Sequence, residues 1–390
     1  MHLQKHNLAT GRVWAWLFAT SLIVAGCGDD PQGAHTVQAD LTPVGVSSLE
    51  ALGQRLYFDT NLSEPAGQSC AACHLPTAGF ADPDAELPTS RGVLPDRFGS
   101  RNAPTAAYAL FSPEFHFDTQ EGLYVGGQFL DGRAATLEEQ AKAPLLNPVE
   151  MNNAEPAAVV NKVRQADYAE LFEEVFGVGA LDDPDTAYEQ IAEAIAAFER
   201  TEIFRPFTSK YDYFLAGQVE LSDQERRGLA LFEAEDKGNC AACHPSRPGE
   251  DGSPPLFTDF TYDNLGVPPN PDNPFLGLPA ELNPEGAAFV DLGLGGVLDD
   301  PAEDGKFKVG SLRNIAVTAP YMHNGVFATL EEVVDFYNTR DVKEWPEPEV
   351  AANVNHDELG NLGLTDQEVE DIVAFLRTLT DGFVPPDAGE

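Results

Sequence analysis

Five residues that can bind a redox cofactor occur twice in this chain. The stretch Cys-Ala-Ala-Cys-His begins at Cys70 and recurs letter for letter from Cys240. Two thiols at this spacing, on a tight helical turn, can each add to a vinyl group of a porphyrin, and Cys-x-x-Cys-His is the attachment motif of c-type haem. The histidine that follows is then placed to bind the iron as its proximal ligand. The expected cofactor-binding residues are Cys70, Cys73, His74, Cys240, Cys243 and His244.

Two other kinds of site use paired cysteines. A redox-active Cys-x-x-Cys pair needs no histidine after it, and a four-cysteine zinc site usually has its pairs about 15–20 residues apart. Here the two pairs lie in separate halves of the chain, and each is followed by histidine. We therefore expect two covalently bound haem c groups and redox chemistry.

The composition narrows the class of protein. The chain has 390 residues, of which 43% are apolar, enough for two or three globular domains with proper cores. Its 34 glycines and 30 prolines indicate long irregular loops. A formal charge of −41 argues against binding to nucleic acid or to anionic lipid, because no basic surface is available. The acidic surface would attract a basic soluble partner, although it is equally consistent with a role in solubility alone.

The first residues are typical of a targeting signal. Lys5 and Arg12 precede an apolar run over residues 13–25, which is too short to span a bilayer comfortably. The run ends in Val-Ala-Gly-Cys27, which resembles a bacterial lipobox, so residues 1–26 are expected to be a lipoprotein-type signal peptide and Cys27 a lipid anchor. An ordinary signal peptide with an unrelated cysteine is the alternative. Either interpretation predicts a protein that leaves the cytoplasm for the periplasm, and the lipobox interpretation adds attachment to the membrane through a lipid alone.

Cys27 and four thioethers account for all five cysteines, so no disulfide is expected. Residues 27–46 carry Pro, Gly and Asp without periodicity and are expected to form a flexible tether.

The pattern around the first haem motif is repeated around the second. A capping box precedes each motif, at Ser47-Ser-Leu-Glu50 and at Ser222-Asp-Gln-Glu225. Each half also ends in an amphipathic helix, over residues 188–198 in the first half and after a third capping box that begins at Thr365 in the second.

This repeat predicts an all-α fold of two fused cytochrome c-like domains with long irregular loops, since no series of alternating strands is evident. The domains are expected at residues 47–205 and 206–384, followed by a tail at 385–390.

Six further stretches make a family resemblance specific. The chain resembles the bacterial di-haem cytochrome c peroxidase and MauG family. The resemblance extends from about Leu49 to the last helix, and the family's motifs occur in the same order. The stretches that carry the resemblance are Arg101–Pro104, Asp131–Ala134, Leu137–Gln140, Pro148–Met151, Leu312–Asn314 and Ala319–Gly325.

The resemblance implies roles for particular residues. Peroxide cleavage needs a group that takes a proton from the near oxygen and returns one to the far oxygen. Glu150 matches the family's distal glutamate, and Gln140 matches the glutamine that holds peroxide or water over the iron. The haem on His74 is then the one that reacts with peroxide, and the haem on His244 receives electrons or shares charge.

The first departure from the family concerns the first haem. Many members carry a histidine in the loop after it that blocks the resting iron, but residues 87–100 contain none. We therefore expect this haem to be open without reductive activation, unless His116 approaches it.

The second departure concerns the far ligand of the second haem. Many family members have a methionine at this position. This chain has Tyr337 there, and MauG likewise has a tyrosine. A phenolate ligand would stabilise the higher oxidation states of the iron, whereas a thioether favours ferrous iron. Met322 and His356 are weaker alternatives, and His323 is expected to line the second haem site.

The third departure is Leu130, at the position where the family has a tryptophan between the haems. Leucine cannot be oxidised, so a ferryl state shared through this position is disfavoured, while electron transfer between the haems by tunnelling stays open. Trp345 is the only tryptophan outside the signal segment, and Tyr124 or Phe129 are candidates for a place near the gap.

The family also holds a calcium ion between its domains. Asn102 by its side chain, and Thr318 and Pro320 by their carbonyl oxygens, match those positions, and oxygen ligands suit calcium. The acidic segment 299–304 is a weaker candidate for a calcium site.

The function that the resemblance implies is reduction of hydrogen peroxide to water with electrons from a small periplasmic cytochrome c or similar donor. The alternative is a MauG-like oxidase that uses a ferryl haem to oxidise a residue of a partner protein. A pure electron-transfer protein is disfavoured by the Gln140 and Glu150 pair. The sequence neither predicts nor excludes a homodimer.

Overall fold

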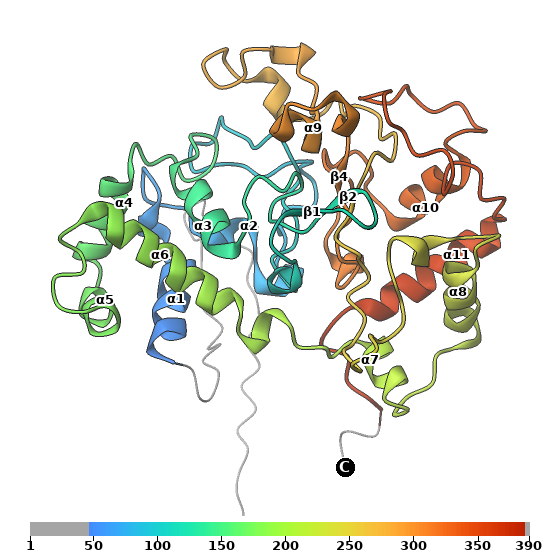
Figure 1. Cartoon of the computed structure of the whole chain (residues 1–390), viewed down its shortest axis with the longest axis horizontal. Helices are drawn as coiled ribbons and strands as arrows, with labels where there is room; N and C mark the ends of the chain where they lie inside the picture. The colour runs from blue at the N-terminus through green and yellow to red at the C-terminus, as the bar shows by residue number, and fades with distance from the viewer. Residues whose placement is uncertain (1–46, 387–390) are drawn as a thin grey trace, which may run out of the picture. The chain divides into compact units, whose positions relative to one another are not determined.

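The structure is a computed structural model that describes residues 47–386. The expected signal peptide, Cys27 and the tether lie outside the described residues. About 39% of the described residues are helical. The α-helices of the described part are α1 Ser48–Phe58, α2 Cys70–Cys73, α3 Leu137–Leu146, α4 Pro156–Gln165, α5 Ala169–Phe176, α6 Pro184–Glu199, α7 Lys210–Leu215, α8 Asp223–Glu233, α9 Gly293–Leu298, α10 Leu330–Thr339 and α11 Asp366–Leu376 (Figure 1).

Two short antiparallel ribbons accompany the helices. Strand β1 (His116–Asp118) pairs with β2 (Leu123–Val125), and β3 (Tyr262–Asp263) pairs with β4 (Phe307–Lys308). The sequence did not predict these ribbons, because strands of two or three residues are too short for alternation to be recognised. The fold is otherwise the helical one expected.

The three expected capping boxes are all present, at the starts of α1, α8 and α11. At the first, the Ser47 amide donates to the Glu50 carboxylate at 2.6 Å, and the Glu50 amide donates to the Ser47 hydroxyl at 3.3 Å. These reciprocal bonds satisfy amides that have no partner within the helix, which is why each helix begins at its predicted residue.

The two halves pack their helices in the same way. Helix α1 crosses α6 in the first half, and α8 crosses α11 in the second (Figure 1). A glycine lies at each crossing: a Cβ on Gly53 would lie 1.9 Å from the Ala194 carbonyl oxygen, and a Cβ on Gly228 would lie 1.9 Å from that of Asp371. Both crossings therefore require the absence of a side chain.

The buried apolar residues form two large clusters. One extends from Leu52 to Phe204 and is centred on edge-to-face aromatic contacts around Phe198. The other extends from Tyr211 to Leu379 and surrounds Phe375 in the same manner. Each cluster packs against the first cysteine of one motif, Cys70 in the first half and Cys240 in the second.

Buried ion pairs and hydrogen bonds join the two halves. Arg101 pairs with Asp291 of the other half and with Asp131 of its own half, at 2.6 Å in each case. The Tyr108 hydroxyl donates to Asp381 at 2.8 Å, and the guanidinium of Arg313 lies 4.9 Å from the Tyr108 ring centre. Within residues 47–386 no helix is long and apolar enough to cross a membrane.

Candidate functional site

The first haem motif forms a single turn of helix, α2, that ends at His74. The His74 amide donates to the Cys70 carbonyl at 3.0 Å, and the Tyr57 hydroxyl donates to the His74 carbonyl at 2.8 Å. The Nδ1 atom of His74 lies 3.2 Å from the carbonyl oxygen of Phe80. Because a carbonyl can only accept, this contact assigns the ring proton to Nδ1 and leaves Nε2 as the nitrogen for iron.

The second motif repeats this arrangement. A 3₁₀ turn over Cys240–Ala242 leads to His244, whose Nδ1 atom lies 2.7 Å from the carbonyl oxygen of Phe257. Phe80 and Phe257 both have left-handed backbones, with φ of 58° and 55°. Burial lowers the pKa of both imidazoles, which favours the neutral form that binds metals. The two carbonyl partners were missed from the sequence, because Phe80 and Phe257 stand at different distances from their histidines.

The four thiols of the motifs are not poised as redox-active thiolates. Burial raises the pKa of Cys70, Cys73, Cys240 and Cys243 to about 12. A thiolate nucleophile needs the opposite shift. Neutral thiols inside apolar surroundings fit attachment of a porphyrin through thioethers.

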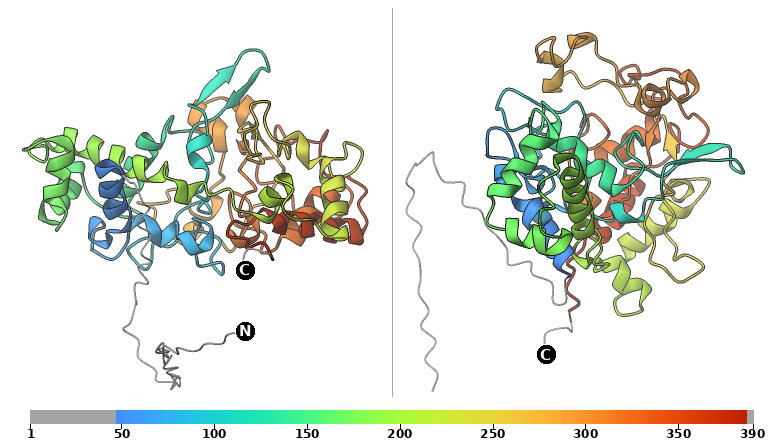
Figure 2. Two further views of the ribbon diagram at one scale, coloured as in Figure 1. Left: turned by 90° about the horizontal axis from the view of Figure 1, so that it is seen from below. Right: turned by 60° about the vertical axis from the view of Figure 1, so that its left-hand side comes forward.

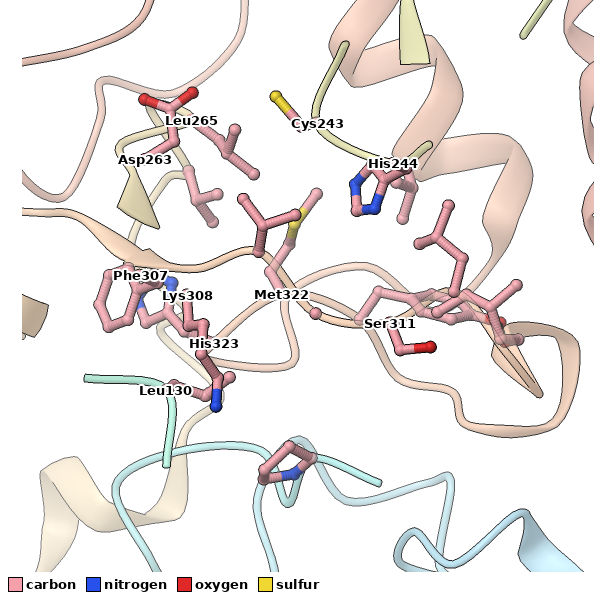
Figure 3. A pocket seen from close by; sticks show the side chains of 18 of the residues that line it. Leu130, Cys243, His244, Asp263, Leu265, Phe307, Lys308, Ser311, Met322 and His323 are labelled. Carbon is pink, nitrogen blue, oxygen red and sulfur yellow. Dashed lines mark hydrogen bonds between the residues drawn. The ribbon is translucent and has the colours of Figure 1, made fainter. Parts of the chain in front are cut away.

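A cavity of about 370 Å³ adjoins the second motif (Figure 3). Its walls bring together segments that are far apart in the sequence and come from both halves of the chain. The lining includes Asn102, Leu130, Cys240, Cys243, His244, Asp263, Phe307, Lys308, Thr318, Pro320, Met322, His323 and Tyr337. The cavity is mostly apolar with thiols and an imidazole at one side, which fits a haem.

Two of the three candidate far ligands of the second haem line this cavity. Tyr337 lies on α10, and burial followed by the Cys240 and Cys243 thiols raises the pKa of its phenol. Figure 3 shows the Met322 side chain pointing into the cavity on the side of His244. The third candidate, His356, is exposed and pairs with Asp341 at 3.1 Å.

Glu150 lies in the turn that follows α3. The side-chain amide of Asn147 donates to Glu150 Oε1 at 2.7 Å, and the Val93 amide donates to the Glu150 carbonyl at 2.9 Å. Val93 belongs to the loop after the first motif, so this loop packs directly against the glutamate.

The surroundings of Glu150 favour its protonated form. Burial raises the pKa of the Glu150 carboxyl, against the opposing effects of the Asn147 amide and the Arg133 charge. The Glu150 charge in turn contributes to the raised pKa of Cys70 and Cys73. Gln68 Nε2 donates to the Arg91 carbonyl at 2.8 Å and to Cys73 Sγ at 3.7 Å, so the loop that holds Glu150 through Val93 is also bound to the first haem motif. The sequence analysis did not identify Asn147. Its position at the end of α3, three residues before Glu150, could have indicated a contact with that glutamate.

Gln140 lies on α3, two turns before the helix ends, and is partly buried. No side chain in the described part of the chain hydrogen-bonds to its amide group. Beside Cys73, the Gln68 Oε1 atom is buried without a hydrogen-bond partner. Buried polar atoms are rarely unpaired, so this one indicates space for a bound group or water near the first motif.

Leu130 lines the cavity at the join between the halves. The Lys308 amide donates to the Leu130 carbonyl at 2.8 Å, and the Lys308 ammonium donates to the Gly127 carbonyl at 2.7 Å. Burial lowers the pKa of Lys308 to about 8. Next to it, the rings of Phe307 and His323 stack at 3.9 Å (Figure 3). His323 therefore lies in the cavity as expected.

Trp345 and His116 lie away from this cavity. Trp345 packs edge to face on Phe336, with ring centres 5.2 Å apart, in the core of the second half. His116 is exposed on β1, and its Nδ1 atom lies 2.8 Å from the Glu114 carbonyl oxygen.

The three expected calcium ligands lie around the same cavity. The Asn102 amide donates to the His323 carbonyl at 2.8 Å, and its side-chain nitrogen donates to the Pro88 carbonyl at 3.2 Å, so Oδ1 is left to accept a cation. Among residues 47–386 no three His, Cys, Asp or Glu side chains cluster as metal ligands, which includes the acidic segment 299–304.

Comparison with known proteins identifies relatives along nearly the whole described chain. The model of the family described as di-haem cytochrome c peroxidase matches residues 47–220. The methylamine utilization protein MauG of Paracoccus denitrificans is 43% identical over 358 residues, which cover 87% of this chain and 90% of that protein. The cytochrome c551 peroxidase of Nitrosomonas europaea is 31% identical over 341 residues, covering 87% and 82%.

Among solved structures, the diheme peroxidase BthA of Burkholderia thailandensis superposes with a TM-score of 0.74 at 37% identity, and covers 86% of this chain and 87% of that one. A MauG-like protein associated with microbial copper homeostasis superposes with a TM-score of 0.65 at 32% identity, covering 86% and 90%.

Proposed function

Since this chain belongs to the di-haem cytochrome c peroxidase family, we propose that it reduces hydrogen peroxide to water with electrons from a small periplasmic cytochrome c or similar donor. The observation that carries the proposal is the position of Glu150, a carboxyl with a raised pKa, beside the first haem motif.

Two haem c groups are the cofactors of this family, and the residues present fit them. His74 and His244 would hold the irons, and the four motif cysteines would hold the porphyrins. When bound, haem supplies the site at which peroxide is cleaved and the electrons are transferred. We propose that 47–205 and 206–384 are the two cytochrome c-like domains; the two separate apolar cores support this division.

In this mechanism Glu150 moves the protons. Its carboxylate takes a proton from the peroxide oxygen nearer the iron and returns it to the farther oxygen, which leaves as water. Burial raises the pKa of the Glu150 carboxyl, and the Asn147 amide and the Arg133 charge oppose this rise. Gln140, with its unpaired amide on the preceding helix, would hold the peroxide in position.

Tyr337 would hold the second iron together with His244. Its proximity to Cys240 and Cys243 supports this role, and Met322 is the competing side chain in the same cavity. The absence of histidine from residues 87–100 supports a first haem that is open in the resting protein.

We also propose a calcium site at Asn102, Thr318 and Pro320, supported by their common position at the cavity. The lipid anchor at Cys27 rests on the sequence alone, and Cys27→Ser should release the protein from membranes if the anchor exists. A homodimer remains a hypothesis for sedimentation to test.

The second candidate function is a MauG-like oxidation of a partner protein. The 43% identity to MauG and the presence of Tyr337 favour it. Leu130 in place of tryptophan counts against a close functional copy. One experiment separates the two: peroxide turnover with reduced cytochrome c, alongside mass spectrometry of proteins that co-purify. Turnover without oxidised partners supports the peroxidase, and oxidised partners without turnover support the alternative.

A further inference from the structure

A row of aromatic rings leads to the surface of the β1–β2 ribbon from Tyr262, whose partner on the neighbouring strand, Lys308, lines the cavity. The Tyr262 and Phe115 ring centres are 6.0 Å apart, and the Phe115 and Tyr124 rings are parallel within 2° at 5.4 Å. Phe117, which is 46% exposed, follows at 4.9 Å from Tyr124. Figure 2 shows the ribbon projecting from the rest of the described chain.

The inner end of this row lies beside the segment that contains Leu130. Tyr262 is 8% exposed, and its hydroxyl donates to the Gly126 carbonyl at 2.5 Å. A Cβ on Gly132 would lie 2.4 Å from the Tyr262 hydroxyl and 2.8 Å from the Phe115 ring. On the neighbouring strand, Tyr262 is opposite Lys308, which lines the cavity. The inner end of the row thus packs on Gly132, two residues after Leu130, the position where the family has its tryptophan.

We propose that Tyr262, Phe115 and Tyr124 form an electron route between the cavity and the exposed ribbon, with Tyr124 as its surface redox site. This route rests on the proposed peroxidase function, because peroxide is its oxidant. Phe115 is not itself oxidised and serves as the contact between the two phenols. Tyr124 is partly exposed, so water can take its phenolic proton. Tyr262 is buried, and its hydroxyl faces the Gly126 carbonyl, which cannot take the proton.

The chemistry balances as follows. Hydrogen peroxide takes up two electrons and two protons and leaves as two molecules of water. For each electron that Tyr124 supplies, its O–H bond breaks, the proton goes to solvent, the electron passes by way of Tyr262 to the oxidised haem site, and a neutral tyrosyl radical remains. The electron donor of the proposed function, a small periplasmic cytochrome c, returns one electron at the ribbon, and solvent returns one proton, to restore the phenol.

The test is to mix the two-haem protein with peroxide in the absence of a donor. Freeze-quenched samples, with and without ring-deuterated tyrosine, are examined by electron paramagnetic resonance, and oxidised residues are mapped by mass spectrometry. The wild-type protein should give a radical signal that narrows on deuteration, with oxidation at Tyr124. Tyr124→Phe should lose the signal, and Tyr262→Phe should lose the oxidation at Tyr124.

Two further variants complete the design. Phe115→Leu breaks the ring contact while both phenols stay, and should also lose oxidation at Tyr124, so the result does not depend on the fold of one variant. Tyr213→Phe is the control, because Tyr213 is partly exposed and packs on Phe383 at 5.9 Å, outside this row. Its signal should match the wild type.

A deuterium-sensitive signal that persists in Tyr124→Phe, or undiminished oxidation of Tyr124 in both Tyr262→Phe and Phe115→Leu, would overturn the route. Wild-type protein that consumes peroxide without any tyrosine-derived signal would overturn the route alone. Wild-type protein that does not consume peroxide would contradict the proposed function and the route together.

Discussion

The side-chain amide of Asn147 donates a hydrogen bond of 2.7 Å to Oε1 of Glu150. Asn147 ends helix α3, and its own Oδ1 accepts from the Val149 amide at 3.1 Å, so the asparagine is fixed by the turn that it supports. A donor held in this way both orients the carboxyl and stabilises its charged form. The helix end therefore orients the residue proposed to move protons and opposes the larger effect of burial on its pKa.

Asn147→Ala should shift the pH dependence of peroxide turnover. Loss of the amide donor raises the pKa of Glu150 further, and Glu150 must be deprotonated to accept the peroxide proton. The rise of kcat/KM with pH should therefore move to higher pH in the variant. An unshifted profile, in a protein with both haem spectra unchanged, would show that Asn147 does not act through Glu150.

Tyr337→Phe should alter only the second haem. In the oxidised protein we expect a high-spin ferric signal from an open first haem beside a low-spin signal from a haem with His244 and Tyr337. The variant should change the low-spin signal alone, and the matched Met322→Leu should change neither. Electron paramagnetic resonance measures both signals. If Met322→Leu alters the low-spin signal and Tyr337→Phe does not, then Met322 and not Tyr337 is the ligand.

Gly53→Ala should destabilise the first half of the chain. The added Cβ would lie 1.9 Å from the Ala194 carbonyl oxygen, so α1 and α6 must separate. Overpacking of this kind costs about 1–3 kcal/mol of unfolding free energy. Thermal unfolding measures the loss. Gly277→Ala is the control, because a Cβ there meets no heavy atom within 4 Å; equal melting temperatures for the two variants would refute the crossing argument.

Local features of the sequence were sufficient for much of the helical fold. The capping boxes at Ser47, Ser222 and Thr365 predict where three helices begin, since a cap depends on residues three positions apart. The Cys-x-x-Cys-His motifs predict haem attachment for the same reason. By contrast, the carbonyls of Phe80 and Phe257 depend on left-handed turns whose distances from the histidines differ, and the two ribbons are too short to give a periodic pattern.

The cavity could not be derived from local pattern at all. Leu130, Lys308 and Tyr337 meet only because buried pairs such as Arg101–Asp291 hold the two halves together. Contacts between such distant residues leave no trace in spacing or periodicity, so the buried Lys308 and the aromatic row from Tyr262 to Tyr124 were not predicted. Glu150 was identified by family resemblance, since nothing local distinguishes it among 64 acidic residues.

The central claim, that Glu150 moves protons during peroxide reduction at the first haem, is tested most directly by the steady-state turnover of Glu150→Gln. The substitution keeps the shape of the side chain and removes its ability to accept a proton. A positioned acid/base is worth roughly 100- to 10,000-fold in rate. Peroxide turnover with reduced cytochrome c should fall by about that factor with both haem spectra intact, while Glu155→Gln, an exposed acid five residues on, should retain wild-type turnover. Wild-type turnover in Glu150→Gln would contradict the account.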